Sequence, residues 1–247
     1  MTKIILKNAS VDYEIHNTKT QSLKSKIVKS FTGGIIRYNA HDSSIKVSAL
    51  SDISLSIIKG DKIGIIGNNG AGKTTILRVL SGIYEPTNGF VEITGNVLPL
   101  IDINLGLDSD ATGIQNIKLR SVIMGIDEND FEDYLTEVVK FADIGEFIYL
   151  PMRTYSSGMQ LRLSFAASTV ISPDILIMDE WISTGDENFS KKANIKLKEI
   201  IDKTNILILA SHNLKLIEEL CNKVLWLEKG KVKMFDKTEK VLKVYAK

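Results

Sequence analysis

The chain is poor in cysteine, proline and net charge, and each shortage excludes a class of protein. One cysteine, Cys221, in 247 residues excludes an intrachain disulfide framework and fits a reducing compartment. In its setting, "IEELCNKVLWL", we expect a buried structural thiol. The 4 prolines form no proline-rich linker. A net charge of only +1 indicates no general attraction to nucleic acid, so no nucleic-acid partner is expected.

Long apolar runs are missing as well. No stretch reaches the roughly 18 consecutive apolar residues that a membrane-spanning helix needs. The first residues, "MTKIILKNASVDYEIH", lack the basic start, apolar stretch and cleavage site of a signal peptide. We therefore expect a cytoplasmic protein whose contact with a membrane comes through a partner.

The segments that are present predict an α/β fold. Apolar runs such as "KIGIIG", "DILIMDE" and "NILILAS" are typical of strands buried on both faces of a mostly parallel sheet. Helical patterns lie between them, so we predict βαβ units within a single domain over residues 1–247. Residues 17–48 are the least strand-like region. Within them "TKTQSLKSKIVKSF" predicts a basic amphipathic helix, either packed on the core or facing lipid phosphates.

A phosphate-binding loop is predicted at residues 67–74, "GNNGAGKT", which fit the pattern G-x-x-x-x-G-K-[ST] between a strand and a helix. Its backbone N–H groups and the following helix N-terminus suit an anion. Lys73 is expected to reach the β- and γ-phosphates of a nucleotide, and the Thr74 hydroxyl to ligate Mg²⁺. The nucleotide-binding residues predicted here are Gly67, Asn68, Asn69, Gly70, Ala71, Gly72, Lys73, Thr74 and Thr75.

Two acids end a predicted buried strand, "ILIMDE", at the edge where open α/β sheets bind ligands. Asp179 is expected to hold Mg²⁺ opposite Thr74, and Glu180 to act as general base toward the attacking water. Two solvated acids at a strand end are the alternative. A further strand ends in His212, which would reach the γ-phosphate from the same edge; an exposed structural histidine is its alternative.

These stations, with "YSSGMQ" at residues 155–160 between them, follow the order found in ATP-binding-cassette ATPases, and the chain resembles that family from about residue 4 to its end. The stretch is similar to the family signature L-S-G-G-Q, although three of its positions differ. A capped surface helix is the alternative. The residues assigned to the signature are Ser156, Ser157, Gly158, Met159 and Gln160.

The resemblance implies an architecture and a partner. A mostly parallel core sheet would be joined by an antiparallel β subdomain and by a helical subdomain at about residues 100–165. The signature would cap ATP held by a second chain, which implies a head-to-tail homodimer. By the same resemblance Tyr13 would stack on adenine, Asp186 would be the acidic residue of the loop after Glu180, and Asp102 would replace the usual metal-linked glutamine.

Local stretches such as "TGIQNI" and "MDEWISTGDENFSKKA" resemble the branch of the family that exports O-antigen, capsule or teichoic-acid polymers. The resemblance implies an ATPase subunit that pairs with a dimeric membrane permease at the cytoplasmic face of the inner membrane. It would move lipid-linked polysaccharide and lack an appended carbohydrate-binding domain. The alternatives are a transport ATPase for another substrate, a cassette ATPase without a permease, and a P-loop kinase.

Overall fold

The structure is a computed structural model that describes residues 1–15, 35–39, 44–101, 103, 106–181 and 187–246. The chain forms two compact units. The first comprises Met1–Ile101, Asp174–Trp181 and Asn205–Lys247, and the second comprises Asp102–Pro173 and Ile182–Thr204. None of the described helices combines the length and the apolarity needed to cross a membrane.

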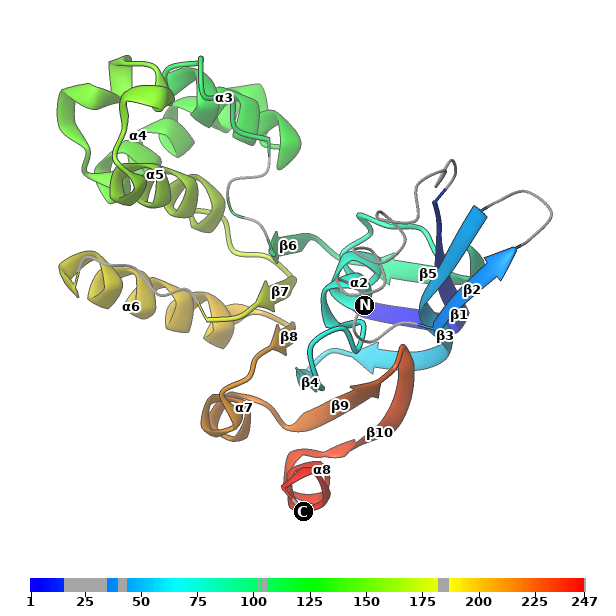
Figure 1. Cartoon of the computed structure of the whole chain (residues 1–247). Coiled ribbons are helices and arrows are strands. Elements are labelled where there is room, and N and C mark those ends of the chain that lie inside the picture. Colours follow the sequence, from blue (N-terminus) through cyan, green and yellow to red (C-terminus); the bar gives the residue numbers. More distant parts are fainter. Residues whose placement is uncertain (16–34, 40–43, 102, 104–105, 182–186, 247) are drawn as a thin grey trace. The chain divides into compact units, whose positions relative to one another are not determined.

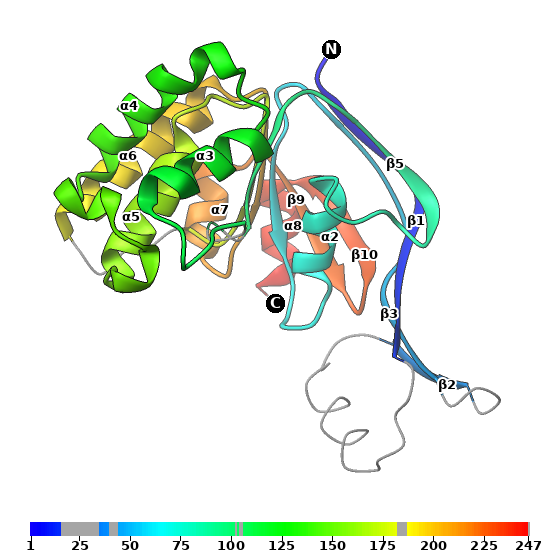
Figure 2. The ribbon, with the colours of Figure 1, turned by 90° about the horizontal axis from the view of Figure 1, so that it is seen from above.

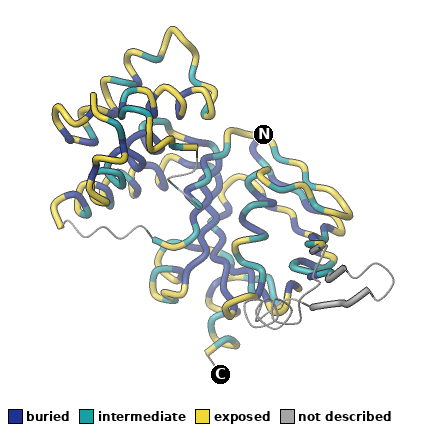
Figure 3. Tube along the Cα trace, turned by 45° about the horizontal axis from the view of Figure 1, so that its top comes forward, coloured by how far each residue is buried: buried dark blue, intermediate teal, exposed yellow. Residues whose placement is uncertain are grey.

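The first unit contains a six-stranded sheet in the order β10-β9-β4-β8-β7-β6. Its strands pair in parallel except for β10, which runs antiparallel to β9. The apolar runs predicted as buried strands form β4, β7 and β8, and the residues of these strands are buried almost throughout (Figure 3). The strands are β4 (Lys62–Ile66), β6 (Val97–Leu100), β7 (Ile175–Asp179), β8 (Ile206–Ala210), β9 (Lys223–Glu228) and β10 (Lys231–Lys237).

A second, antiparallel sheet of the first unit has the strand order β2-β3-β1-β5 (Figure 1). Helix α2 contacts strands of both sheets, and its buried face shares one hydrophobic core with them (Figure 2). Helices α7 and α8 also belong to this unit. The bounds are β1 (Lys3–Ile15), β2 (Ile35–Asn39), β3 (Ser44–Ile58), β5 (Asn88–Thr94), α2 (Lys73–Leu80), α7 (Leu214–Leu220) and α8 (Thr238–Tyr245).

The region expected to be least strand-like contains strand β2 and the first part of β3, so that prediction is wrong for residues 35–39 and 44–48. The two segments pair with each other from Ile35 opposite Ser48 to Asn39 opposite Ser44. Strand formation here depends on a partner strand more than on local composition. The predicted basic helix, residues 18–31, lies outside the described residues.

The second unit is helical. Three aromatic rings, Phe141, Phe165 and Phe189, pack together with centroids 5.7–6.0 Å apart and join α4, α5 and α6. This unit is larger than the predicted interval of about residues 100–165, because the chain returns to it with α6. Its elements are α3 (Gly113–Ile123), η1 (Glu128–Asp130), α4 (Phe131–Ala142), η2 (Gly145–Tyr149), η3 (Met152–Thr154), α5 (Ser157–Thr169) and α6 (Glu187–Lys203).

Candidate nucleotide site

The predicted phosphate loop leaves β4 and enters α2, as its sequence context required. Gly67 and Gly72 have φ angles of 149° and 103°, in a region that favours glycine. Space excludes a side chain at both positions: a Cβ on Gly67 would collide with the Leu227 carbonyl oxygen, and one on Gly72 would lie 2.9 Å from that of Ala49. Replacing either glycine with a larger residue would therefore push the loop away from the backbone of Leu227 or Ala49.

Lys73 begins α2 and reaches back across the loop. Its Nζ atom donates to the carbonyl oxygens of Gly67 and Asn68, at 2.8 and 3.3 Å. Burial lowers the pKa of Lys73, and the carboxylates of Asp179 and Glu180 oppose that shift. The ammonium group is thus a partly buried cation that an incoming anion would stabilise.

Thr74 and Asp179 meet although they belong to distant parts of the chain. The Thr74 hydroxyl donates to Asp179 Oδ2 at 2.8 Å, which joins the first turn of α2 to the end of β7. A hydroxyl and a carboxylate are hard oxygen donors, and Mg²⁺ in proteins commonly takes one or two carboxylates together with substrate phosphates. The donor set present therefore fits the predicted metal ion.

Glu180 and His212 follow the ends of two neighbouring parallel strands, β7 and β8. Glu180 Oε1 accepts from the backbone N–H of His212 at 2.9 Å, and Oε2 accepts from the Ser211 hydroxyl at 2.8 Å. Both carboxylate oxygens are therefore held by residues of the β8 end. The sequence does not single out Ser211 as a site residue, because nothing in "ILILASHN" shows which strand lies beside β8.

A cavity of about 320 Å³ brings these side chains together, a volume at the lower end of the range for small-molecule pockets. Three predicted nucleotide-loop residues, Gly67, Asn68 and Ala71, do not line it. Val47 and Ala49 line it without having been predicted, since their place opposite β1 depends on strand register. The lining residues are Tyr13, Val47, Ala49, Asn69, Gly70, Gly72, Lys73, Thr74, Thr75, Asp179, Glu180 and His212.

Tyr13 brings an aromatic ring to the cavity wall, opposite Val47 in the pairing of β1 with β3. Its ring lies edge-on to that of Tyr84, with centroids 6.2 Å apart. Burial raises the pKa of Tyr13, and a hydrogen bond with Thr75 opposes the rise. The phenol is therefore neutral at physiological pH and offers a flat apolar surface at the mouth of the phosphate loop.

The predicted signature stretch lies in the second unit and starts α5. Ser156 is the N-cap, and its hydroxyl accepts from the backbone N–H of Met159 at 3.2 Å. Ser156, Ser157 and Gly158 are exposed, and a Cβ on Gly158 would meet only the Ser156 hydroxyl oxygen, at an ordinary contact distance of 3.9 Å. Gln160 is half-buried and donates through Nε2 to the Met152 carbonyl at 3.3 Å. The helix start is thus capped, uncrowded and available to an external anion.

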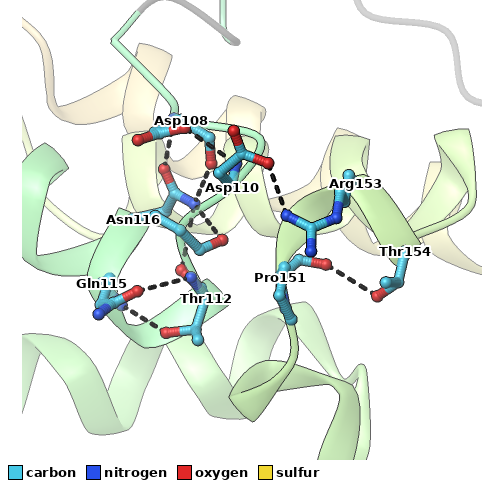
Figure 4. A network of polar contacts seen from close by, with 9 residues as sticks. Asp108, Asp110, Thr112, Gln115, Asn116, Pro151, Arg153 and Thr154 are labelled. Carbon is cyan, nitrogen blue, oxygen red and sulfur yellow. Dashed lines mark hydrogen bonds and ion pairs between the residues drawn. The ribbon is translucent and has the colours of Figure 1, made fainter.

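A polar network braces the approach to this helix start (Figure 4). The fully buried Asn116 side chain donates to the carbonyls of Asp108, Ala111 and Thr112, and accepts from the Asp108 N–H at 2.7 Å. Arg153 pairs with Asp110 at 2.6 Å. Gln115 completes a capping box with Thr112 at the start of α3. Asp102 and Asp186 lie outside the described residues.

Comparisons with known proteins agree with this geometry. The family model described as "ABC transporter" matches residues 50–183. The chain is 38% identical over 230 residues to the O-antigen export system ATP-binding protein RfbE of Yersinia enterocolitica, covering 93% of this chain and 96% of that protein. It is 36% identical over 247 residues to RfbB of Myxococcus xanthus, also named for O-antigen export; that match covers 99% of this chain but only 56% of RfbB.

A third relative, the teichoic acids export ATP-binding protein TagH of Staphylococcus saprophyticus, is 35% identical over 98% of this chain and 87% of its own length. Among solved structures, the ATP-binding cassette MJ0796, a dimer bound to ADP and Pi, superposes with a TM-score of 0.67 at 18% identity. That match covers 95% of this chain and 98% of MJ0796, and shows the fold alone. The chain belongs to the ABC transporter family of ATP-binding proteins and is an ABC-type ATPase.

Proposed function

We propose that this chain is the ATPase subunit of an exporter that moves a lipid-linked polysaccharide, of the O-antigen or teichoic-acid kind, across the cell membrane. The names of the relatives from Yersinia enterocolitica and Staphylococcus saprophyticus support the export of cell-surface polymers. Identities of 35–38% support the polymer class and leave the individual polymer open. A membrane permease would supply the path through the bilayer, and would hold this chain at the cytoplasmic face.

The observation that carries the proposal is the convergence of Lys73, Thr74, Asp179, Glu180 and His212 on one cavity. Lys73 and the N–H groups at the α2 start would bind the phosphates, and Thr74 with Asp179 would hold Mg²⁺. When bound, the metal ion neutralises charge that develops on the phosphate oxygens.

Glu180 takes a proton from the attacking water, because its carboxylate stands at the cavity wall with both oxygens oriented. The imidazole of His212 donates to the γ-phosphate from the neighbouring strand end. Tyr13 stacks on the base, since its ring is the aromatic surface of the cavity lining.

The exposed start of α5 caps the ATP of a second chain. Ser156 supplies a hydroxyl, and the N–H groups of the first turn, at Ser157 and Gly158, supply donors and the positive end of a helix dipole. By the family resemblance, Asp186 remains the acidic residue of the loop after Glu180, and Asp102 takes the place of the metal-linked glutamine. The functional unit would be a homodimer with ATP between the chains, docked on two permease subunits.

The proposal is tested in cells that depend on this chain for a surface polymer. Replacing it with Glu180→Gln should remove the polymer from the surface while the lipid-linked form accumulates on the inside, measured by immunoblotting intact and lysed cells. Ser121→Ala, a substitution at a buried serine of α3, is the control and should export normally. Normal surface polymer with Glu180→Gln, or loss of a different exported substrate, would contradict it.

A further inference from the structure

The backbone at Glu180 is unusual and directs its side chain toward β8. Its φ angle is 73°, in the left-handed region that residues other than glycine seldom adopt. Glu180 N–H still donates to the Ala210 carbonyl at 2.9 Å, so the pairing of β7 with β8 continues up to this residue. Backbone conformations of this kind persist where the surroundings hold them, and they gather at functional sites.

Ser211 is the buried residue that contacts the Glu180 side chain. The residue is 2% exposed, and its hydroxyl donates to Glu180 Oε2 at 2.8 Å. The Ser211 hydroxyl oxygen also accepts from the Asn213 backbone N–H at 3.1 Å. A serine hydroxyl has a single proton to donate. Because the hydrogen bond with the Asn213 amide uses the amide's own proton, the Ser211 proton remains for the Glu180 carboxylate. Water has little access to compete for it.

The second oxygen of the same carboxylate is held by the main chain, from His212 N–H to Oε1 at 2.9 Å. Two consecutive residues therefore hold both oxygens of an otherwise exposed glutamate. A single donor would leave the carboxylate free to rotate, whereas two donors on different oxygens fix its plane. Substitution of the His212 side chain leaves its N–H in place, so Ser211 is the side chain on which this orientation depends.

We propose that Ser211 is a positioning residue for ATP hydrolysis, which holds the Glu180 carboxylate in the orientation that receives the proton of the attacking water. The inference rests on the role proposed above for Glu180. Its physical basis is that a general base must lie within hydrogen-bond reach of the proton it takes, and small displacements cost much of the rate. Ser211 lies outside the cavity lining and acts only through Glu180.

The first test compares Ser211→Ala with wild type. We expect kcat for ATP to fall about 10-fold, with KM and the dissociation constant for ATP, measured without hydrolysis, within about twofold. Ser121→Ala, the same change at another buried serine, should alter neither value. ATP with Mg²⁺ should also leave a larger dimeric fraction of Ser211→Ala by size-exclusion chromatography, since slower hydrolysis prolongs the closed dimer. Unchanged or raised kcat overturns the inference.

A double-mutant cycle separates positioning from general damage. If Ser211 acts through the carboxylate, Ser211→Ala should cost nothing further in a Glu180→Gln background, whereas independent effects would add. If Ser211→Ala lowers kcat by the same factor in the wild-type and Glu180→Gln backgrounds, the inference is overturned, whereas the proposed function still stands. Wild-type turnover in Glu180→Gln alone would instead contradict the proposed role of Glu180. Melting temperatures of all variants exclude unfolding as the cause of any loss.

Discussion

The Thr74 hydroxyl and the Asp179 carboxylate lie 2.8 Å apart, although 105 positions separate them in the chain. Thr74 sits in the first turn of α2, directly after the loop that leaves β4, and Asp179 ends β7. Strand β8 lies between β4 and β7, so loop and acid emerge at the same edge of three parallel strands. Parallel strands thus bring the loop at residues 67–74 and the Asp179 carboxylate to one edge of the sheet, where open α/β sheets bind ligands.

Thr74→Val should weaken the use of Mg²⁺, because it removes one oxygen donor and leaves Asp179 without its partner. We expect the Mg²⁺ concentration for half-maximal ATPase activity to rise about 10-fold or more. Thr74→Ser keeps the hydroxyl and should stay near wild type. The measurement is a Mg²⁺ titration of turnover at fixed ATP, and identical curves for the valine and serine variants would contradict the assignment.

Tyr13→Ala should lower the affinity for ATP about 10-fold, since one stacked base is worth about 1–3 kcal/mol. Tyr13→Phe keeps the ring and should retain most of the affinity. Tripolyphosphate, which carries no base, serves as the internal control in equilibrium binding. Equal weakening of ATP and tripolyphosphate binding would mean that Tyr13 supports the phosphate loop and does not contact the base.

The start of α5 should act on a nucleotide held by the other chain. Ser156→Asp and Ser156→Asn both keep a good N-cap, so they differ mainly by a negative charge where phosphate is expected. We expect Ser156→Asp to be inactive and Ser156→Asn to retain more activity. Mixing Ser156→Asp with Lys73→Ala should then restore ATPase activity, because mixed dimers contain one intact site.

The same mixture distinguishes action between chains from action within one chain. If the α5 start served the phosphate loop of its own chain, every chain in the mixture would carry a defect, and no activity would return. Turnover measured across mixing ratios should peak near equal amounts. A flat profile at the level of the inactive parents would contradict the homodimeric clamp.

Cys221 should be unreactive in the folded protein. The residue is 6% exposed, and burial raises the pKa of its thiol to about 12. Alkylation by iodoacetamide at pH 8 should therefore be at least about 10-fold slower in native than in unfolded protein, because the thiolate is the reacting form. Equal rates followed by mass spectrometry would show that the thiol is accessible and ionised.

The raised pKa of Cys221 also has a consequence for stability. Between about pH 9 and about pH 12 the thiol of the unfolded chain loses its proton while the folded thiol keeps it. The contribution of Cys221 to the free energy of unfolding is therefore complete below about pH 9 and is lost as pH rises toward about 12. The difference in melting temperature between wild type and Cys221→Ala should shrink over that window. A constant difference would contradict the assigned protonation.

The sequence predicts the place of a site residue best where that residue lies next to its own strand in the chain. The positions of the loop at residues 67–74 and of the two acids at the end of β7 could be predicted, because each lies within a few residues of the strand that positions it. Val47 and Ala49 could not, since their place at the cavity depends on the register between β1 and β3. Ser211 could not either, because its contact with Glu180 requires β7 and β8 to be neighbours.

We propose that Glu180 is the general base for ATP hydrolysis within a dimer of this chain. The most direct test measures ATPase activity and ATP-dependent dimerisation of purified wild type and Glu180→Gln, each with and without Mg²⁺. We predict that Glu180→Gln loses turnover at least about 100-fold yet forms a stable dimer when ATP is present. A Glu180→Gln variant that stays monomeric with ATP and hydrolyses it at the wild-type rate would contradict both the role of Glu180 and the shared site.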